Sequence, residues 1–158
     1  MYKGTSSSAR RNERGTILAE FSIGLMVLVL VIFGIADFGR ALYAYHFVSL
    51  APRQATRWAT VRGSYCTEFA TACPATSSDI AGYVTSIAPG GVDTSQLITT
   101  ATCGNPGVFG TRGPCTSPNN SPGKVVNVTV QYNFLFLYGF VSTLSTTMSS
   151  SAQMIIWQ

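Results

Sequence analysis

One apolar segment dominates the first third of the chain. After a polar and basic start, the residues from Ile17 to Ala36 are apolar with few exceptions. A helix of about 20 residues is about 30 Å long, which matches the hydrocarbon core of a bilayer. A secretory signal has a shorter apolar region, usually about 7–15 residues, and ends at a small-x-small site that "GIADFGRALYAY" lacks. The pattern therefore favours a retained transmembrane helix over residues 16–36.

Helical periodicity continues after the apolar segment. Alanine and arginine occupy separate faces at four-residue spacing, with Ala51, Ala55 and Ala59 on one face and Arg53 and Arg57 on another. This spacing indicates an amphipathic helix. Pro52 is expected to kink this helix or to begin a new one, and Gly63 is expected to end it. We predict an amphipathic extension over residues 37–62 that lies on the following domain or on the membrane surface.

Residues 63–158 have the pattern of a small α+β domain. Apolar and polar residues alternate strictly in "KVVNVTVQYNF", which predicts a strand with one buried face. Further strands are predicted in "QLITTATC" and "SSSAQMIIWQ". The stretch at 135–144, "LFLYGFVSTL", is expected to form an apolar connection that contacts the membrane or a partner. The fold class is therefore α+β, with a long N-terminal helix followed by antiparallel strands.

Two local features complete this domain. Ser78 is expected to cap a short helix that ends at "PGG". This helix would carry its apolar side chains on one face, namely Ile80, Tyr83, Val84 and Ile87. Residues 104–123 are rich in Gly, Pro and Asn, and a loop of this length is either a displayed surface or a pinned excursion.

The distribution of charge orients the chain in a membrane. The formal net charge is +4. Four basic residues precede the apolar segment, namely Lys3, Arg10, Arg11 and Arg14, against one acidic residue, Glu13. The positive-inside rule therefore places residues 1–15 in the cytoplasm and the rest of the chain outside. Beyond Arg62 only Arg112 and Lys124 are basic, and no basic patch alternates with aromatic residues, so we expect no nucleic-acid binding.

All four cysteines follow the apolar segment: Cys66, Cys73, Cys103 and Cys115. An even number in an oxidising compartment predicts two disulfides, and three pairings are possible. We favour Cys66 with Cys73 and Cys103 with Cys115, because each of these bonds closes a short loop. A metal site is not expected, since no C-x₂-C pair occurs and the single histidine, His46, lies far from the cysteines in the sequence.

The sequence offers little for catalysis. His46 is the only histidine, no G-x-S-x-G motif occurs, and the acidic residues of the outer domain, Glu68, Asp79 and Asp93, are far apart in sequence. We expect no enzymatic activity, no cofactor and no small-molecule substrate.

Four stretches together resemble the TadE-like family, the minor pseudopilins of the Tad (tight adherence) pilus system of bacteria. They are "RGTILAEFSIGLMVLVLVIFGIADFGRALYAY", "APRQATRWATVRG", "GKVVNVTVQYNF" and the polar ending with Met154. The resemblance is strongest over residues 10–62. It implies a single-pass protein of the bacterial inner membrane, with a cytoplasmic N-terminus and a pilin-like periplasmic domain at 63–158. Its implied partners are other pilin and pseudopilin subunits, the inner-membrane pilus platform and a prepilin peptidase.

The resemblance also implies roles for residues near the N-terminus. Gly15 would end a leader cut by the prepilin peptidase, and Thr16 would become the new N-terminus. Glu20 and Phe21 would then be the fifth and sixth mature residues. A charge in lipid costs a few kcal/mol, so Glu20 would gain by pairing with the free amine, most usefully that of a neighbouring subunit. The alternative is a carboxyl group that reaches the headgroups or stays protonated.

At the other end of the apolar segment, Asp37 and Arg40 are one helical turn apart. We expect a solvated ion pair at the membrane interface, with a docking role in assembly as the alternative. For the whole chain, the sequence predicts a structural component of pilus assembly. The alternative is a solitary membrane-anchored periplasmic binding domain that uses its disulfide-pinned loop at 103–123.

Overall fold

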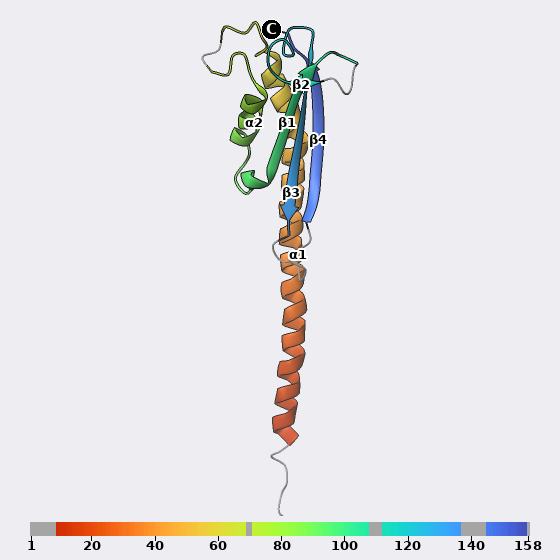
Figure 1. The fold of residues 1–158 in the computed structure, drawn as a ribbon. Coiled ribbons are helices and arrows are strands. Elements are labelled where there is room, and N and C mark those ends of the chain that lie inside the picture. Colours follow the sequence, from red (N-terminus) through yellow and green to blue (C-terminus); the bar gives the residue numbers. More distant parts are fainter. Residues whose placement is uncertain (1–8, 69–70, 108–111, 137–144, 158) are drawn as a thin grey trace, which may run out of the picture.

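The computed structural model describes residues 9–68, 71–107, 112–136 and 145–157 of the chain. A single helix, α1 (Ala9–Thr60), runs the length of the molecule, and its C-terminal part carries a small head (Figure 1). The head contains one shorter helix, α2 (Ser77–Ser86), and a four-stranded antiparallel sheet. The α+β class predicted from the sequence is thereby confirmed.

The first half of α1 stands alone below the head, and its apolar side chains are exposed. Ile17, Phe21 and Ile35 retain 65%, 66% and 69% of their accessible surface. The most apolar window of the helix has a mean hydropathy of 2.5 and none of it is buried. Isolated apolar side chains are common on soluble proteins, but a whole exposed apolar helix is not. This half of α1 fits a single-pass membrane anchor.

The sheet has two long strands side by side at one edge and two shorter strands beyond them. Its strands are β1 (Leu97–Gly104), β2 (Gly113–Pro114), β3 (Val125–Leu135) and β4 (Ser145–Ile155), in the order β2-β1-β3-β4. A short 3₁₀ helix, η1 (Thr94–Gln96), precedes β1. The register of β3 and β4 is unbroken from Val125 opposite Ile155 to Leu135 opposite Ser145. Residues 137–144, which form most of the predicted apolar connection, lie outside the described residues.

The predicted alternation in β3 and the predicted alanine face of α1 meet in the core. Val126, Val128 and Val130 are each 0% exposed and share a hydrophobic cluster with the alanines of α1. Ala51, Ala55 and Ala59 have no side chain beyond Cβ, so α1 can approach the sheet closely. Arg53 and Arg57 are exposed. The amphipathic prediction is confirmed, and the buried face lies on the head.

Pro52 does not begin a new helix, which was one of the two expected outcomes. The helix is continuous through Pro52, which is buried. Proline removes one backbone hydrogen bond and crowds the preceding turn. Here the flanking alanines Ala51 and Ala55 are packed in the core on both sides of Pro52, and this packing holds the helix together.

Helix α1 ends at Thr60, two residues before the predicted limit and three before Gly63. The carbonyls of its last turn are satisfied by side-chain and backbone donors from elsewhere. Trp157 donates its backbone N–H to the Thr60 carbonyl at 3.1 Å, and Arg62 donates from Nη1 to the Trp58 carbonyl at 3.2 Å. The polypeptide after β4 therefore completes the helix end, a long-range contact that no local stop signal reveals.

Helix α2 begins at Ser77, directly after its cap, and that cap is Thr76 rather than the predicted Ser78. Thr76 and Asp79 form a capping box, in which the Thr76 backbone N–H donates to Asp79 Oδ2 at 2.9 Å. The apolar face was predicted correctly. Ile80 and Val84 are buried, and the ring of Tyr83 stacks on Trp58 of α1 with centroids 4.9 Å apart.

Two disulfides close loops in the outer part of the head. Cys66 is bonded to Cys73 and Cys103 to Cys115, the local pairing favoured from the sequence. Cys103 and Cys115 are each 1% exposed and belong to the main hydrophobic cluster. This second bond therefore joins β1 to the segment after β2 from within the core.

Candidate functional site

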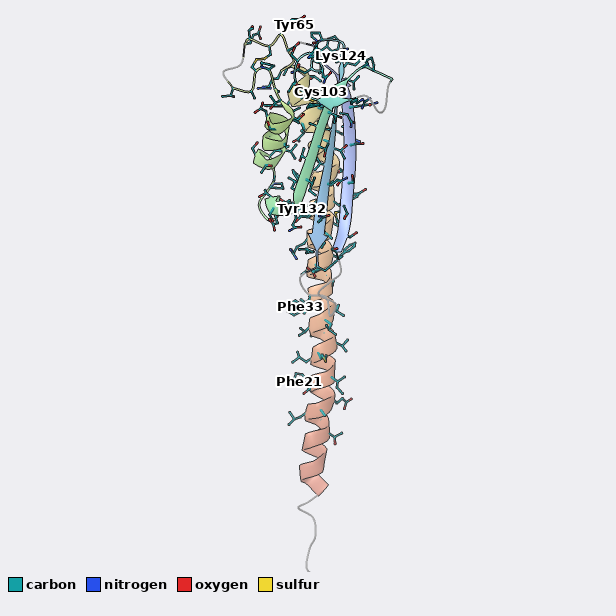
Figure 2. The ribbon with its side chains drawn as sticks, in the orientation of Figure 1. Phe21, Phe33, Tyr65, Cys103, Lys124 and Tyr132 are labelled. Carbon is teal, nitrogen blue, oxygen red and sulfur yellow. A yellow bond between two sulfur atoms is a disulfide. The ribbon has the colours of Figure 1, made fainter. Side chains whose placement is uncertain are left out.

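The residues proposed for processing and assembly lie on the exposed half of α1. Gly15, Thr16, Glu20 and Phe21 are all exposed. Thr16 and Glu20 are four residues apart, so they share one face and are separated by about 6 Å along the helix axis. Figure 2 shows the Phe21 side chain on the bare part of the helix, well below the head. No other element of the described chain packs against this part of α1.

A comparison with Ser22 shows what is unusual about Glu20. The Ser22 hydroxyl donates to the Leu18 carbonyl at 2.7 Å, so this polar group is satisfied within its own helix. The described residues offer the Glu20 carboxylate no hydrogen-bond or ion-pair partner. A carboxylate cannot be satisfied by helix carbonyls, because it only accepts hydrogen bonds. Within an apolar span, Glu20 requires either a proton or a cationic partner.

At the outer end of the apolar segment, Asp37 and Arg40 form the expected ion pair. Arg40 Nη1 lies 2.8 Å from Asp37 Oδ1. The expectation that the pair is solvated was wrong for Asp37, which is 5% exposed. The reason is that the head extends further down α1 than the sequence suggests. The Arg40 guanidinium lies 5.5 Å from the ring centroid of Phe134, near the end of β3, and Phe134 packs edge-on against Phe136.

An apolar groove runs along α1 beside the end of α2. Its volume is about 560 Å³, and its lining includes Leu42, His46 and Leu50 from α1 and Ile87 and Pro89 from the segment that follows α2. The three α1 residues recur every four positions on a face different from that of the buried alanines. The spacing of these residues is visible in the sequence and could have indicated a second exposed face of α1, but the groove was not predicted. His46 is exposed, as expected for a surface residue.

The loop that the sequence suggested as a binding surface is held to the sheet where it is described. Arg112 donates from Nη2 to Gln153 Oε1 of β4 at 3.3 Å. Gly113 allows a close approach, because a Cβ at this position would lie 2.7 Å from Asn119 Nδ2. Residues 108–111 of this loop lie outside the described residues. The described part of the loop thus has the character of a pinned excursion.

The described ranges contain no group of three His, Cys, Asp or Glu side chains that could hold a metal ion. Among the described residues, the features that bear on function are the exposed apolar half of α1, the Glu20 carboxylate within it and the Asp37–Arg40 ion pair.

The comparison with known families concerns the same helix. A family model described as TadE-like protein matches residues 15–57. The match lies within α1 and does not extend to the head. The matched segment begins at the proposed leader end and includes Glu20, the Asp37–Arg40 pair and most of the alanine face, and it confirms the resemblance found in the sequence. No curated protein and no solved structure matches the chain. The match and the exposed apolar helix together fit a membrane-associated component.

Proposed function

We propose that this chain is a minor pseudopilin, a structural component that assembles with other subunits of a Tad-type pilus in the bacterial inner membrane. The observation that carries the proposal is Glu20, which has no partner among the described residues and lies inside an exposed apolar helix, within the segment that matches the TadE-like family model. In this role the N-terminus is cytoplasmic and the head is periplasmic. The protein performs no catalysis and needs no cofactor.

Leader removal supplies the partner that Glu20 lacks. Cleavage by a prepilin peptidase after Gly15 leaves an α-amino group on Thr16 at the cytoplasmic edge of the span. Within one subunit the amine and the carboxylate are one helical turn apart. Between subunits, the amine of one chain reaches the carboxylate of the next when their spans pack side by side. Because an unpaired charge in lipid costs a few kcal/mol, this pair favours association over isolation.

The arrangement of the head is compatible with this association. The sheet and α2 pack only against the C-terminal part of α1, where the buried residues begin at Asp37 and Ala44. The span below them is left accessible on all sides, so spans of neighbouring subunits can pack without rearrangement of the head. The core alanines pack the head onto the same helix. The position of the span therefore determines the position of the head on the periplasmic side.

A solitary membrane-anchored binding domain is the second candidate, and the apolar groove beside α2 favours it. A groove of about 560 Å³ is within the size range of small-ligand sites. The two functions differ in their need for Glu20. A receptor anchored by one span gains nothing from a carboxylate in the lipid, whereas an assembling subunit does.

The test compares Glu20→Gln with Ser22→Ala in the source bacterium. Ser22 is two residues away and also polar, so its variant controls for a change at the same depth. We expect Glu20→Gln to reduce chemical cross-links between this chain and other pilus subunits several-fold, and to lower the number of pili seen by electron microscopy. Ser22→Ala should change neither. Normal cross-linking and normal piliation of Glu20→Gln would contradict the assembly role and leave the binding domain as the better account.

A further inference from the structure

A small cavity lies at the membrane-proximal end of the head. Its volume is about 170 Å³, and it is lined by Arg40, Asp93, Gln96, Tyr132, Asn133 and Leu135. These residues come from α1, from η1 and its N-terminal cap, and from the end of β3. Figure 2 shows Tyr132 low on the sheet, above the bare helix that carries Phe33. The lining contains one cation, one anion and two side-chain amides.

The position of Arg40 sets the height of this cavity relative to a bilayer. The predicted span ends at Ala36, and Arg40 follows four residues later, or about 6 Å further along the helix axis. The headgroup region occupies roughly 5–8 Å on each side of the hydrocarbon core. The cavity therefore opens within the headgroup layer of the outer leaflet of the membrane that α1 crosses. At this depth the headgroups of the lipids themselves are available as ligands.

Arg40 forms the cationic side of the cavity, and its side chain is held in place while several of its N–H groups can still donate. The Arg40 side chain is 45% exposed, and it donates one hydrogen bond to Asp37 at 2.8 Å. The Phe134 ring lies 5.5 Å away and supports the plane of the guanidinium. A guanidinium carries five N–H donors, so several remain for another acceptor. Phosphate is the group that this geometry suits best, because its oxygens accept paired hydrogen bonds.

The anionic side is equally fixed. Asp93 Oδ1 accepts hydrogen bonds from the Ser95 backbone N–H at 2.9 Å and from the Ser95 hydroxyl at 2.7 Å. The backbone N–H of Asp93 donates to the Tyr132 hydroxyl at 3.3 Å, which ties this turn to β3. The hydrogen bonds from Ser95, side chain first and backbone second, hold the pKa of the Asp93 carboxyl below its usual range. Asp93 is therefore ionised at neutral pH, and its second oxygen can accept from a cation.

We propose that this cavity binds the headgroup of a phospholipid that carries both a phosphate and a primary ammonium, as phosphatidylethanolamine does. The phosphate lies against Arg40, and the ammonium donates to Asp93. A purely anionic headgroup leaves Asp93 without a partner and is repelled by it. The quaternary ammonium of phosphatidylcholine has no N–H to donate. The inference rests on the membrane anchor and not on the assembly role, so either can fail without the other.

The experiment is native mass spectrometry of the full chain in detergent with equimolar phosphatidylethanolamine, phosphatidylcholine and phosphatidylglycerol. The variants are Arg40→Gln and Asp93→Asn. Asparagine keeps the oxygen that caps η1, so Asp93→Asn removes charge with little effect on the fold. Arg53→Gln and Glu68→Gln are the matched controls, because both side chains are exposed and lie outside the cavity lining. Circular dichroism verifies that each variant is folded.

The wild type should retain phosphatidylethanolamine over the other two lipids by about two- to fivefold, the factor expected for one partly exposed charge pair. Asp93→Asn should lose the preference over phosphatidylcholine, Arg40→Gln should lower retention of all three lipids, and both controls should behave as wild type. Equal retention of the three lipids by the wild type, or an unchanged preference in Asp93→Asn, would overturn the proposal. Displacement of the lipid by soluble phosphoethanolamine at a similar concentration would also overturn it, because the ligand would then be a solute.

Discussion

Arg40 donates from Nη1 to Oδ1 of Asp37 at 2.8 Å, and the two side chains differ sharply in exposure, at 45% for the arginine and 7% for the aspartate. The buried Asp37 carboxylate therefore depends on this contact more than the exposed Arg40 guanidinium does. Removal of the arginine takes this cation away from a buried anion, whereas removal of the aspartate charge leaves an arginine that water can solvate.

We expect Arg40→Gln to lower the free energy of unfolding of the head by about 1–3 kcal/mol, and Asp37→Asn to lower it by less. Thermal unfolding of the full chain in detergent, followed by near-ultraviolet circular dichroism, measures both. Arg53→Gln, an exposed arginine on the same helix, should stay within about 0.5 kcal/mol of wild type. A larger loss in Asp37→Asn than in Arg40→Gln would contradict this account.

The sequence predicted most of what depends on local periodicity. The strict alternation from Val126 to Phe134 identified β3 and its buried face, and the four-residue spacing of Ala51, Ala55 and Ala59 identified the face of α1 that packs on it. The short loops between Cys66 and Cys73 and between Cys103 and Cys115 were enough to favour the pairing that the structure has.

What the sequence did not predict depends on contacts between distant segments. Pro52 stays within α1 because the sheet holds the helix on both sides of it, and the end of α1 at Thr60 depends on Trp157. Asp37 was expected to be solvated because the lower limit of the head could not be read from residue types. The small cavity at the membrane-proximal end of the head joins Arg40 to Asp93 and Tyr132, which no local pattern brings together.

Because α1 packs closely on the sheet, substitutions at neighbouring positions of the helix should differ in their effect on stability. Ala55 is 0% exposed, so Ala55→Leu has to displace the sheet and should destabilise the head by about 1–3 kcal/mol. Gln54 is exposed on the adjacent face, and Gln54→Leu should have little effect. Urea unfolding midpoints of the two variants test this. Equal destabilisation would mean that α1 does not pack on the sheet through its alanine face.

The two disulfides should differ in their response to reductant. Cys103 and Cys115 are each 1% exposed, whereas Cys73 is partly exposed in an outer loop. Mild reductant followed by alkylation and peptide mapping should therefore label Cys66 and Cys73 first. Replacement of Cys103 and Cys115 by alanine should cost about 2–4 kcal/mol, because the bond closes a loop of 12 residues within the core. Earlier labelling of Cys103 would contradict the buried position of this bond.

The capping box of α2 predicts a dependence of stability on pH. The side-chain and backbone hydrogen bonds from Thr76 lower the pKa of Asp79 from the ordinary value of 3.8. A lowered folded-state pKa gives stability that is present above the unfolded value and is lost as pH falls through the folded value.

Asp79→Asn should therefore be less stable than wild type at pH of about 6, by about 0.5–1 kcal/mol, the usual contribution of a helix cap. The difference should disappear in acid, once Asp79 of the wild type is protonated. Chemical unfolding of both proteins from acid to neutral pH measures this difference in stability. The difference is small because the carboxylate is exposed to solvent. A difference that persists unchanged in acid would show that Asp79 acts through packing rather than through its charge.

The most direct measurement of the proposed function is the mass of the N-terminus of the protein isolated from its native membranes, compared between wild type and Gly15→Val. A Cβ at Gly15 would meet nothing within 4 Å, so this variant changes the cleavage site without disturbing the helix, and Gly24→Val, equally unobstructed, is the control. The proposed function predicts a wild-type chain that begins at Thr16, the same start in Gly24→Val, and an intact leader in Gly15→Val. An intact leader in the wild type, with the cognate peptidase present, would contradict the pseudopilin role.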